Sequence, residues 1–302
     1  MKIAAIDIGT NSTRLLIVDY IDCEYNILER DLITTRLGEG VDKNGYLNKK
    51  AIKRTIEALE IYNNKIKEYG VDETKVVGTS ALRDVKNNQN FVELVKEKTS
   101  FNLEVISGNK EASYIYIGVK SDINKENFLI SDIGGGSTEF IWKKNDKVIE
   151  KSLDIGAVRL TERNIENKNK ALTNNNYNAL KTEIKEIIEG SEINSDKADK
   201  MIGVGGTITT LAAMDLELVE YDSQKIHHYL LSKKKIDEIF VKLSQSNLDE
   251  RKNMKGLNEG RADIITAGTV ILKLIMEQFD FKEILISERD ILFGLINEVI
   301  EK

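Results

Sequence analysis

The sequence contains no proline, one cysteine and one tryptophan among its 302 residues, and its apolar runs are short. The single cysteine, Cys23, excludes an internal disulfide. A membrane-spanning helix needs roughly 20 consecutive apolar residues, and no run in this sequence approaches that length. Met1-Lys2-Ile3 leads directly into a strand-like segment, without the apolar stretch of a signal peptide. We therefore expect a cytoplasmic protein that does not span a membrane, and we interpret the lack of proline as compositional drift.

Composition and charge indicate a globular protein without a strong electrostatic preference. Hydrophobic residues make up 41% of the chain and charged residues 31%, which is typical of folded domains. The length corresponds to about two domains. Because the net charge is −6, a polyanion would need a local basic cleft or a metal ion to bind. We therefore expect no nucleic-acid partner, and the oligomeric state stays open, a homodimer included.

An internal repeat is the most informative feature. Residues 6–14 (IDIGTNSTR) and 131–139 (SDIGGGSTE) carry Asp, Ile, Gly, Ser and Thr at the same relative positions. Each copy lies between two apolar runs, which predicts a strand, a tight polar turn and a second strand. A third strand-like stretch follows each copy, at residues 27–35 and 148–153. We interpret the pattern as a duplicated domain.

The remainder of each half alternates helical and strand-like segments, which is typical of a mixed α/β sheet. Apolar spacing predicts helices near residues 51–69, 111–119, 177–188, 207–214, 264–276 and 290–300. Short buried strands are predicted at residues 75–78, 103–106, 201–204 and 284–287. We place the domain boundary near residues 118–126. The first predicted domain comprises residues 1–122 and the C-terminal helix at 289–302, and the second comprises residues 123–288.

Three glycine-rich turns follow predicted strands. They comprise Gly9, Thr10, Asn11, Ser12 and Thr13; Gly134, Gly135, Gly136, Ser137 and Thr138; and Gly205, Gly206 and Thr207. Such turns expose backbone N–H groups and hydroxyls that suit phosphate oxygens. One such turn alone is more often an ordinary hairpin, but the first two are duplicated and each follows an aspartate. These residues, Asp7 and Asp132, either hold Mg²⁺, directly or through water, or cap their turns.

Four blocks, in order, resemble the exopolyphosphatase and guanosine pentaphosphate phosphohydrolase family. They are residues 78–83 (GTSALR), 106–112 (ISGNKEA), 130–140 (ISDIGGGSTEF) and 261–265 (RADII), and the resemblance extends from Lys2 to about Gly294. The glycine-rich turns also resemble the phosphate and nucleoside motifs of the actin/hexokinase superfamily. The resemblance implies an α/β fold of two ribonuclease H-like (actin-like ATPase) domains with the active site in the interdomain cleft. It also implies Mg²⁺-dependent removal of terminal phosphate from a phosphoanhydride chain.

The resemblance suggests roles for four charged residues. Glu111 matches the family's catalytic glutamate, although a glutamate in the first turn of a helix is often only structural. Arg83 matches the family arginine and, with Arg14, suits bidentate binding of phosphate oxygens, the alternative being a surface ion pair. Glu139 takes the position of Arg14 in the second repeat copy. It is either a water-orienting or metal-linked carboxylate or a cross-strand charge on a hairpin.

The chain also departs from the family. Where the family usually has Leu-Arg-Glu-Gly, this sequence has residues 291–294 (ILFG). Long members carry a further helical C-terminal region that supports long polymers, and this sequence stops before it. We therefore expect cleavage of short polyphosphate or of a nucleotide tail rather than of long polyphosphate. The pair His227-His228 lacks the spacing of metal ligands and is interpreted as a polar turn.

The leading hypothesis is a hydrolase of inorganic polyphosphate or guanosine pentaphosphate. Glu111 activates the water, the glycine-rich turns and Arg83 bind the phosphates, and Asp132 helps to hold Mg²⁺. One alternative is a kinase of the same superfamily. The other is a sensor that binds guanosine tetra- or pentaphosphate with little catalysis.

Overall fold

The computed structural model describes residues 1–123, 127–144, 147–193 and 198–301. The chain divides into two compact units. Unit 1 comprises Met1–Ile123 and Arg289–Lys302, and unit 2 comprises Asn124–Glu288. Residues 124–126 of the predicted boundary segment lie outside the described residues. Within the described ranges, no helix combines the length and apolar character needed to cross a bilayer.

Unit 1 is built on a five-stranded sheet. Its strands are β1 (Lys2–Ile8), β2 (Thr13–Ile21), β3 (Glu24–Ile33), β4 (Glu73–Gly78) and β5 (Leu103–Val105). Their order is β3-β2-β1-β4-β5. The first three strands form an antiparallel meander, whereas β1, β4 and β5 run parallel. The predicted strand, turn and strand of the first repeat copy are thereby confirmed.

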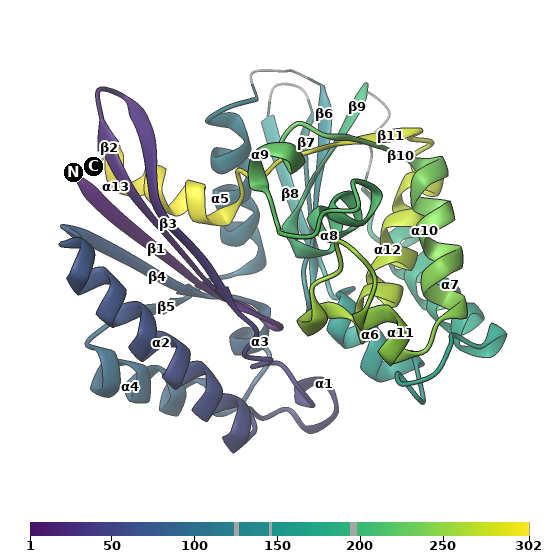
Figure 1. The fold of residues 1–302 in the computed structure, drawn as a ribbon, viewed down its shortest axis with the longest axis horizontal. Coiled ribbons are helices and arrows are strands. Elements are labelled where there is room, and N and C mark those ends of the chain that lie inside the picture. The colour runs from purple at the N-terminus through teal and green to yellow at the C-terminus, as the bar shows by residue number, and fades with distance from the viewer. Residues whose placement is uncertain (124–126, 145–146, 194–197, 302) are drawn as a thin grey trace. The chain divides into compact units, whose positions relative to one another are not determined.

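Helices cover both faces of this sheet. The longest helix, α2 (Lys49–Tyr69), packs with α4 (Asn88–Thr99) on one face, and α5 (Gly108–Lys120) packs with α13 (Ile291–Ile300) on the other (Figure 1). Two short helices, α1 (Val41–Asn44) and α3 (Ser80–Arg83), lie in the connections. Asn48 caps the start of α2, and Gly70 ends it in a left-handed conformation.

Unit 2 repeats the same plan with a six-stranded sheet. Its strands are β6 (Phe128–Ile133), β7 (Thr138–Lys144), β8 (Lys147–Leu153), β9 (Lys200–Val204), β10 (Leu230–Ser232) and β11 (Glu283–Ile286). Their order is β10-β11-β9-β6-β7-β8. Strands β6 to β8 form the second antiparallel meander, and β6, β9 and β11 run parallel. The duplication predicted from the repeat is therefore present in both sheets.

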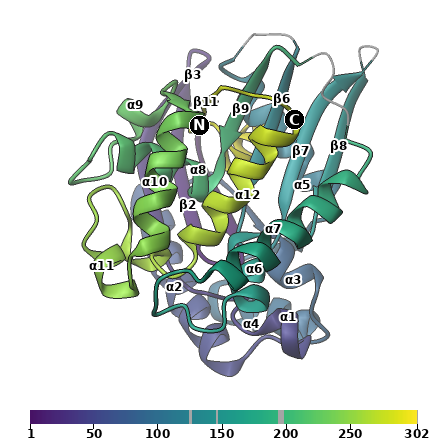
Figure 2. The same ribbon diagram turned by 90° about the vertical axis from the view of Figure 1, so that its right-hand side faces the viewer.

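The described part of unit 2 contains seven α-helices, and the last of them, α12, is buried. They are α6 (Ala157–Asn164), α7 (Asn174–Glu189), α8 (Gly205–Asp215), α9 (Ser223–Ile226), α10 (Lys233–Gln245), α11 (Leu248–Lys252) and α12 (Ile265–Gln278), with a 3₁₀ turn at Glu259–Arg261. Figure 2 shows α12 running between α10 and α7. Residues 265–276 are all buried, in agreement with a helix that is apolar on nearly every face. The one charge among them, Lys273, pairs with Asp237 and lies over the ring of Phe240.

Candidate phosphate site

The proposed site residues follow the parallel strands of each sheet. In unit 1 the first glycine-rich turn follows β1, α3 with Arg83 follows β4, and α5 with Glu111 follows β5. In unit 2 the second and third turns follow β6 and β9. Open α/β sheets bind ligands at the carboxyl ends of their strands. The fold thus gathers the predicted residues of each unit at the edge where a ligand is expected.

The first turn is held in place through its carbonyl groups. Gly9 donates its N–H to Ser12 O at 3.0 Å, and Gly38 donates to Thr10 O at 2.9 Å. The hydroxyl of Thr13 bonds the hydroxyl of Thr35 at 3.0 Å. A side chain on Gly38 would overlap Thr10, so this close approach requires glycine. The turn is therefore fixed before any ligand arrives.

The second turn has the same internal hydrogen bond. Gly134 donates to Ser137 O at 3.0 Å, the repeat equivalent of the Gly9 bond. The first N–H groups of α6 donate to the carbonyls of Gly134 and Gly135, and Arg159 Nε donates to Gly136 O at 2.7 Å. Because the carbonyls are engaged by protein donors, the N–H groups of the turn are the groups that remain for an anion. Within the described ranges, those of Gly135 and Gly136 donate to no protein acceptor.

The third turn brings an aspartate and an arginine together. Gly205 has a φ of 84°, and a side chain there would overlap the carboxylate of Asp132. A side chain on Gly206 would overlap the guanidinium of Arg261. The predicted site residues Asp132, Gly205 and Gly206 are therefore neighbours in unit 2. Arg261 lies in one of the resembling blocks, so the sequence contained the signal for it, but the prediction did not place it at the site.

Asp7 and Arg14 form a cross-strand ion pair in unit 1. They are directly paired in the β1–β2 register, and Arg14 Nη2 lies 2.6 Å from Asp7 Oδ2. Arg14 also pairs with Asp290, at the start of α13. Burial raises the pKa of Asp7, against the lowering effect of Arg14. The other oxygen, Oδ1, is buried and has no hydrogen-bond partner among the described residues.

Glu111 lies in the first turn of α5, beside Arg83. Ser107 caps this helix by accepting the N–H of Lys110 at 3.2 Å. Arg83 Nη1 lies 2.6 Å from Glu111 Oε2, and the two side chains are only 19% and 13% exposed. The ion pair of the alternative interpretation is therefore present, but it is partly buried rather than at the surface, and the role of Arg83 stays a prediction. Burial raises the pKa of Glu111 to about 7; Arg83 lowers it, and the carboxylate of Asp7 raises it.

Glu139 faces Asp132 across the β6–β7 hairpin, as Arg14 faces Asp7 in unit 1. Both carboxylates are buried, at 1% and 7% exposure. The hydroxyls of Ser137 and Ser152 donate to Glu139 Oε1 at 2.8 and 2.7 Å. Two carboxylates directly opposite one another repel unless a proton or a cation intervenes. The cross-strand position of Glu139 is thus observed, while its role stays a prediction.

The oxygen donors present in each unit fit a hard divalent cation. Mg²⁺ prefers one or two carboxylates together with water and phosphate oxygens. The unpartnered Oδ1 of Asp7 offers such a ligand in unit 1. The carboxylate of Asp132 beside the third turn offers one in unit 2. The predicted metal residues are therefore chemically suited to the ion.

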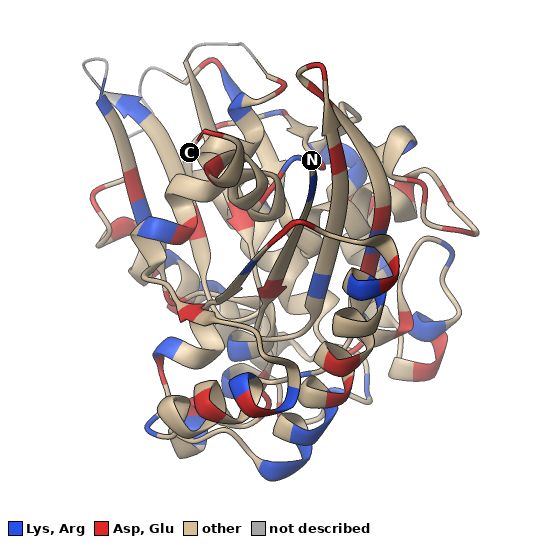
Figure 3. Cartoon of the chain, turned by 90° about the vertical axis from the view of Figure 1, so that its left-hand side faces the viewer, with Lys and Arg blue, Asp and Glu red and all other residues tan. Residues whose placement is uncertain are grey.

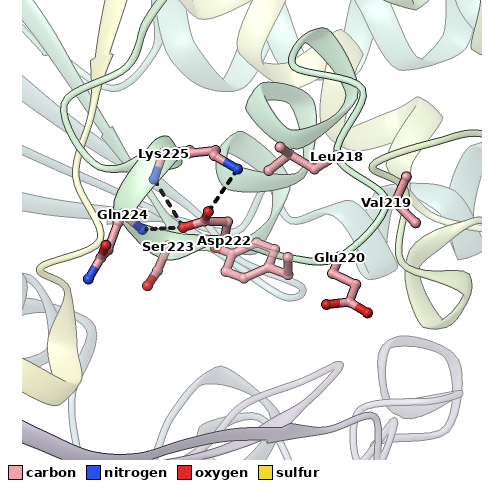
Figure 4. Close-up of a pocket in the computed structure, with 8 residues that line it drawn as sticks. Leu218, Val219, Glu220, Asp222, Ser223, Gln224 and Lys225 are labelled. Atoms are coloured by element: carbon pink, nitrogen blue, oxygen red, sulfur yellow. Dashed lines mark hydrogen bonds and ion pairs between the residues drawn. The ribbon is translucent and has the colours of Figure 1, made fainter.

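Two other features of unit 2 differ from this pattern. The rings of His227 and His228 stack 3.9 Å apart, and His227 Nδ1 accepts the N–H of Glu288. The loop at residues 218–225 lines a cavity of about 630 Å³ (Figure 4). There Asp222 accepts N–H groups of α9 and pairs with Lys225 at 3.1 Å. The sequence analysis did not predict this cavity, whose lining side chains include two carboxylates and one ammonium.

Charge on the molecular surface is mixed. In Figure 3, lysine and arginine are interspersed with aspartate and glutamate along the helices and strands. This distribution agrees with the net charge of −6. Any anion would therefore have to be held by local groups and not by the overall charge.

Comparison with known proteins decides the family. A model of the Ppx/GppA phosphatase family matches residues 5–301. The chain belongs to this family. It is 31% identical to exopolyphosphatase 2 of Mycobacterium tuberculosis, over 97% of both chains. It is 38% identical to a bifunctional 3-dehydroquinate synthase/phosphatase of Fusobacterium nucleatum, over 99% of this chain and 46% of that protein.

A solved structure gives the same result. The Aquifex aeolicus member of the Ppx/GppA family is 32% identical, with a TM-score of 0.82, over 100% of this chain and 98% of that one. The predicted family, the α/β actin-like ATPase fold and the hydrolase class are thereby confirmed. The chain spans about half of the length of the Fusobacterium relative.

Proposed function

We propose that this Ppx/GppA phosphatase removes terminal phosphate from inorganic polyphosphate or guanosine pentaphosphate, and that it requires a divalent cation. The observation that carries the proposal is Glu111, a partly buried carboxylate held by Arg83 at 2.6 Å, with a pKa of about 7. A carboxylate poised near neutral pH can accept a proton from water more readily than an ordinary glutamate. Family membership and the name of the Mycobacterium relative support the substrate class.

The reaction is an in-line hydrolysis. The oxygen of a water molecule forms a bond to the terminal phosphorus while the bond from phosphorus to the bridging oxygen breaks. Glu111 orients the water and takes its proton. Arg83 engages Oε2 of Glu111, so that Oε1 is the oxygen assigned to the water. The shortened phosphate chain leaves with the bonding electrons and takes up a proton.

The turns and the aspartates bind the substrate. The N–H groups of the second turn are assigned to phosphate oxygens, and the third turn adds the nearby guanidinium of Arg261. Asp7 and Asp132 are assigned to Mg²⁺. When bound, the cation neutralises charge on the phosphate oxygens.

The test is release of inorganic phosphate with Mg²⁺ from short polyphosphate, long polyphosphate, guanosine pentaphosphate and ATP. Glu111→Ala should lower turnover at least ~100-fold, the usual contribution of a general base. Glu57→Ala is a matched control, because Glu57 pairs with Lys53 on the exposed side of α2, and it should retain turnover. Full activity of Glu111→Ala would contradict the assignment. Tight nucleotide binding without release would instead indicate a sensor, and transfer to an acceptor other than water would indicate a kinase.

A further inference from the structure

Asp290 is a charged residue of unit 1 to which the proposed reaction gives no role. Asp290 precedes α13, and its Oδ2 accepts from Arg14 Nη1. The same guanidinium donates to Asp7 Oδ2 through Nε and Nη2, at 3.0 and 2.6 Å. The two carboxylate side chains are each only 6% exposed. Arg14 is therefore held at both ends, by carboxylates far apart in the sequence.

Asp290 is itself fixed in place. Its Oδ1 caps α13 by accepting the N–H of Leu292 at 3.0 Å. The helix behind it packs closely on α5, because a side chain on Gly118 would overlap the carbonyl of Asp290 and one on Gly294 would overlap that of Tyr114. The Asp290 carboxylate thus presents a fixed anchor to Arg14.

Arg14, held by Asp290 at its other end, engages one oxygen of Asp7. A guanidinium bound at one end only keeps much of its rotational freedom, whereas one held at both ends has lost it. With Nη1 on Asp290, the remaining donors meet Asp7 at Oδ2. Asp7 is 4% exposed, and its Oδ1 has no hydrogen-bond partner in the described part of the chain. Buried oxygens without a partner are rare in proteins, and each calls for a ligand or a water.

We propose that Asp290 is a positioning residue that holds Arg14 on Oδ2 of Asp7 and so keeps Oδ1 available to a divalent cation or its bound water. The inference rests on the proposed function, because it concerns the same site. Asp290 acts through Arg14 and contacts neither cation nor substrate.

The first test is Asp290→Asn in the full chain. Asparagine retains the helix cap but removes the charge that anchors Arg14. Mn²⁺ binding without substrate, measured from free Mn²⁺ by electron paramagnetic resonance, should weaken roughly tenfold, as for other residues that orient a metal ligand. The kcat should fall by a similar factor while the KM stays within about twofold. Asp222→Asn is the matched control, since Asp222 also caps a helix, and its Mn²⁺ affinity should equal that of the wild type.

A double-mutant cycle distinguishes positioning from a purely structural role. If Asp290 acts through Arg14, Asp290→Asn should weaken Mn²⁺ binding no further in an Arg14→Gln background. Arg14→Lys provides a second background if Arg14→Gln does not fold. Additive losses, unchanged Mn²⁺ binding in Asp290→Asn, or no Mn²⁺ binding by the wild type would each overturn the inference. Coupled Mn²⁺ binding without phosphate release would uphold it while contradicting the proposed function.

Discussion

The two copies of the repeat share a backbone and differ in charge. In both copies the first glycine of the turn donates its N–H to the serine carbonyl at 3.0 Å. In both, the aspartate near the end of the first strand faces one residue of the second strand. In unit 1 that partner of the aspartate is Arg14, whereas in unit 2 it is Glu139. The first hairpin therefore places opposite charges across its two strands, and the second places two buried carboxylates opposite one another.

The difference shows how duplication can separate two tasks. The charges around Asp7 are fixed internally by a guanidinium, which preorganises the site and limits the repulsion between Asp7 and Glu111. In unit 2 the hydroxyls of Ser137 and Ser152 both donate to the carboxylate of Glu139. Two facing carboxylates are stabilised by a proton or a cation placed beside them. We infer that unit 1 supplies the base and that unit 2 is the more dependent on the metal.

The largest expected effect comes from making the first hairpin like the second. Arg14→Glu places a third carboxylate between Asp7 and Asp290 in a mostly buried position, so the folded state should lose about 3–5 kcal/mol. Urea unfolding measures this loss. Lys53→Glu is the control, because Lys53 pairs with Glu57 at an exposed position, and it should cost less than about 1 kcal/mol. Equal losses in the two variants would show that the first hairpin does not depend on its internal pair.

A smaller effect should appear in the pH dependence, because the titrating base lies in unit 1. The pKa of Glu111 is about 7 in the folded chain against an ordinary value of 4.5. Turnover should therefore fall about tenfold for each pH unit below 7, as the base becomes protonated. Between pH 4.5 and about pH 7, Glu111 is protonated in the folded chain but ionised in the unfolded chain. The contribution of Glu111 to the free energy of unfolding therefore falls as the pH rises through this range.

Glu111→Gln checks the sign of this dependence. The unfolding free energy of Glu111→Gln should change less with pH across that range than that of the wild type. Urea unfolding at several pH values measures the difference. The raised pKa would be contradicted if the unfolding free energy of the wild type rose with pH through this range more steeply than that of Glu111→Gln.

The sequence predicted the part of the site that depends on local patterns. The repeat predicted both turns, and the position of Glu111 in the first turn of a helix followed from the Ser-Gly start of α5. It could not show that Arg14 is shared with Asp290, since the two residues are 276 positions apart. Nor could it show that Arg261 lies over Gly206. Such contacts depend on how strands and helices pack, and no spacing in the chain encodes them.

The smallest expected effect comes from removing one charge of the second hairpin. Glu139→Gln leaves an oxygen that can accept from Ser137 and Ser152 but relieves the repulsion from Asp132, so the unfolding free energy should stay unchanged or rise by less than about 1 kcal/mol. Mn²⁺ affinity should fall roughly tenfold, as for a residue linked to a metal ligand. Ser152→Ala is the matched control, because it removes a hydroxyl donor and leaves both carboxylates. A clear loss of stability in Glu139→Gln with unchanged Mn²⁺ affinity would mean that Glu139 serves the hairpin and not the cation, and the proposed division between the two units would fail.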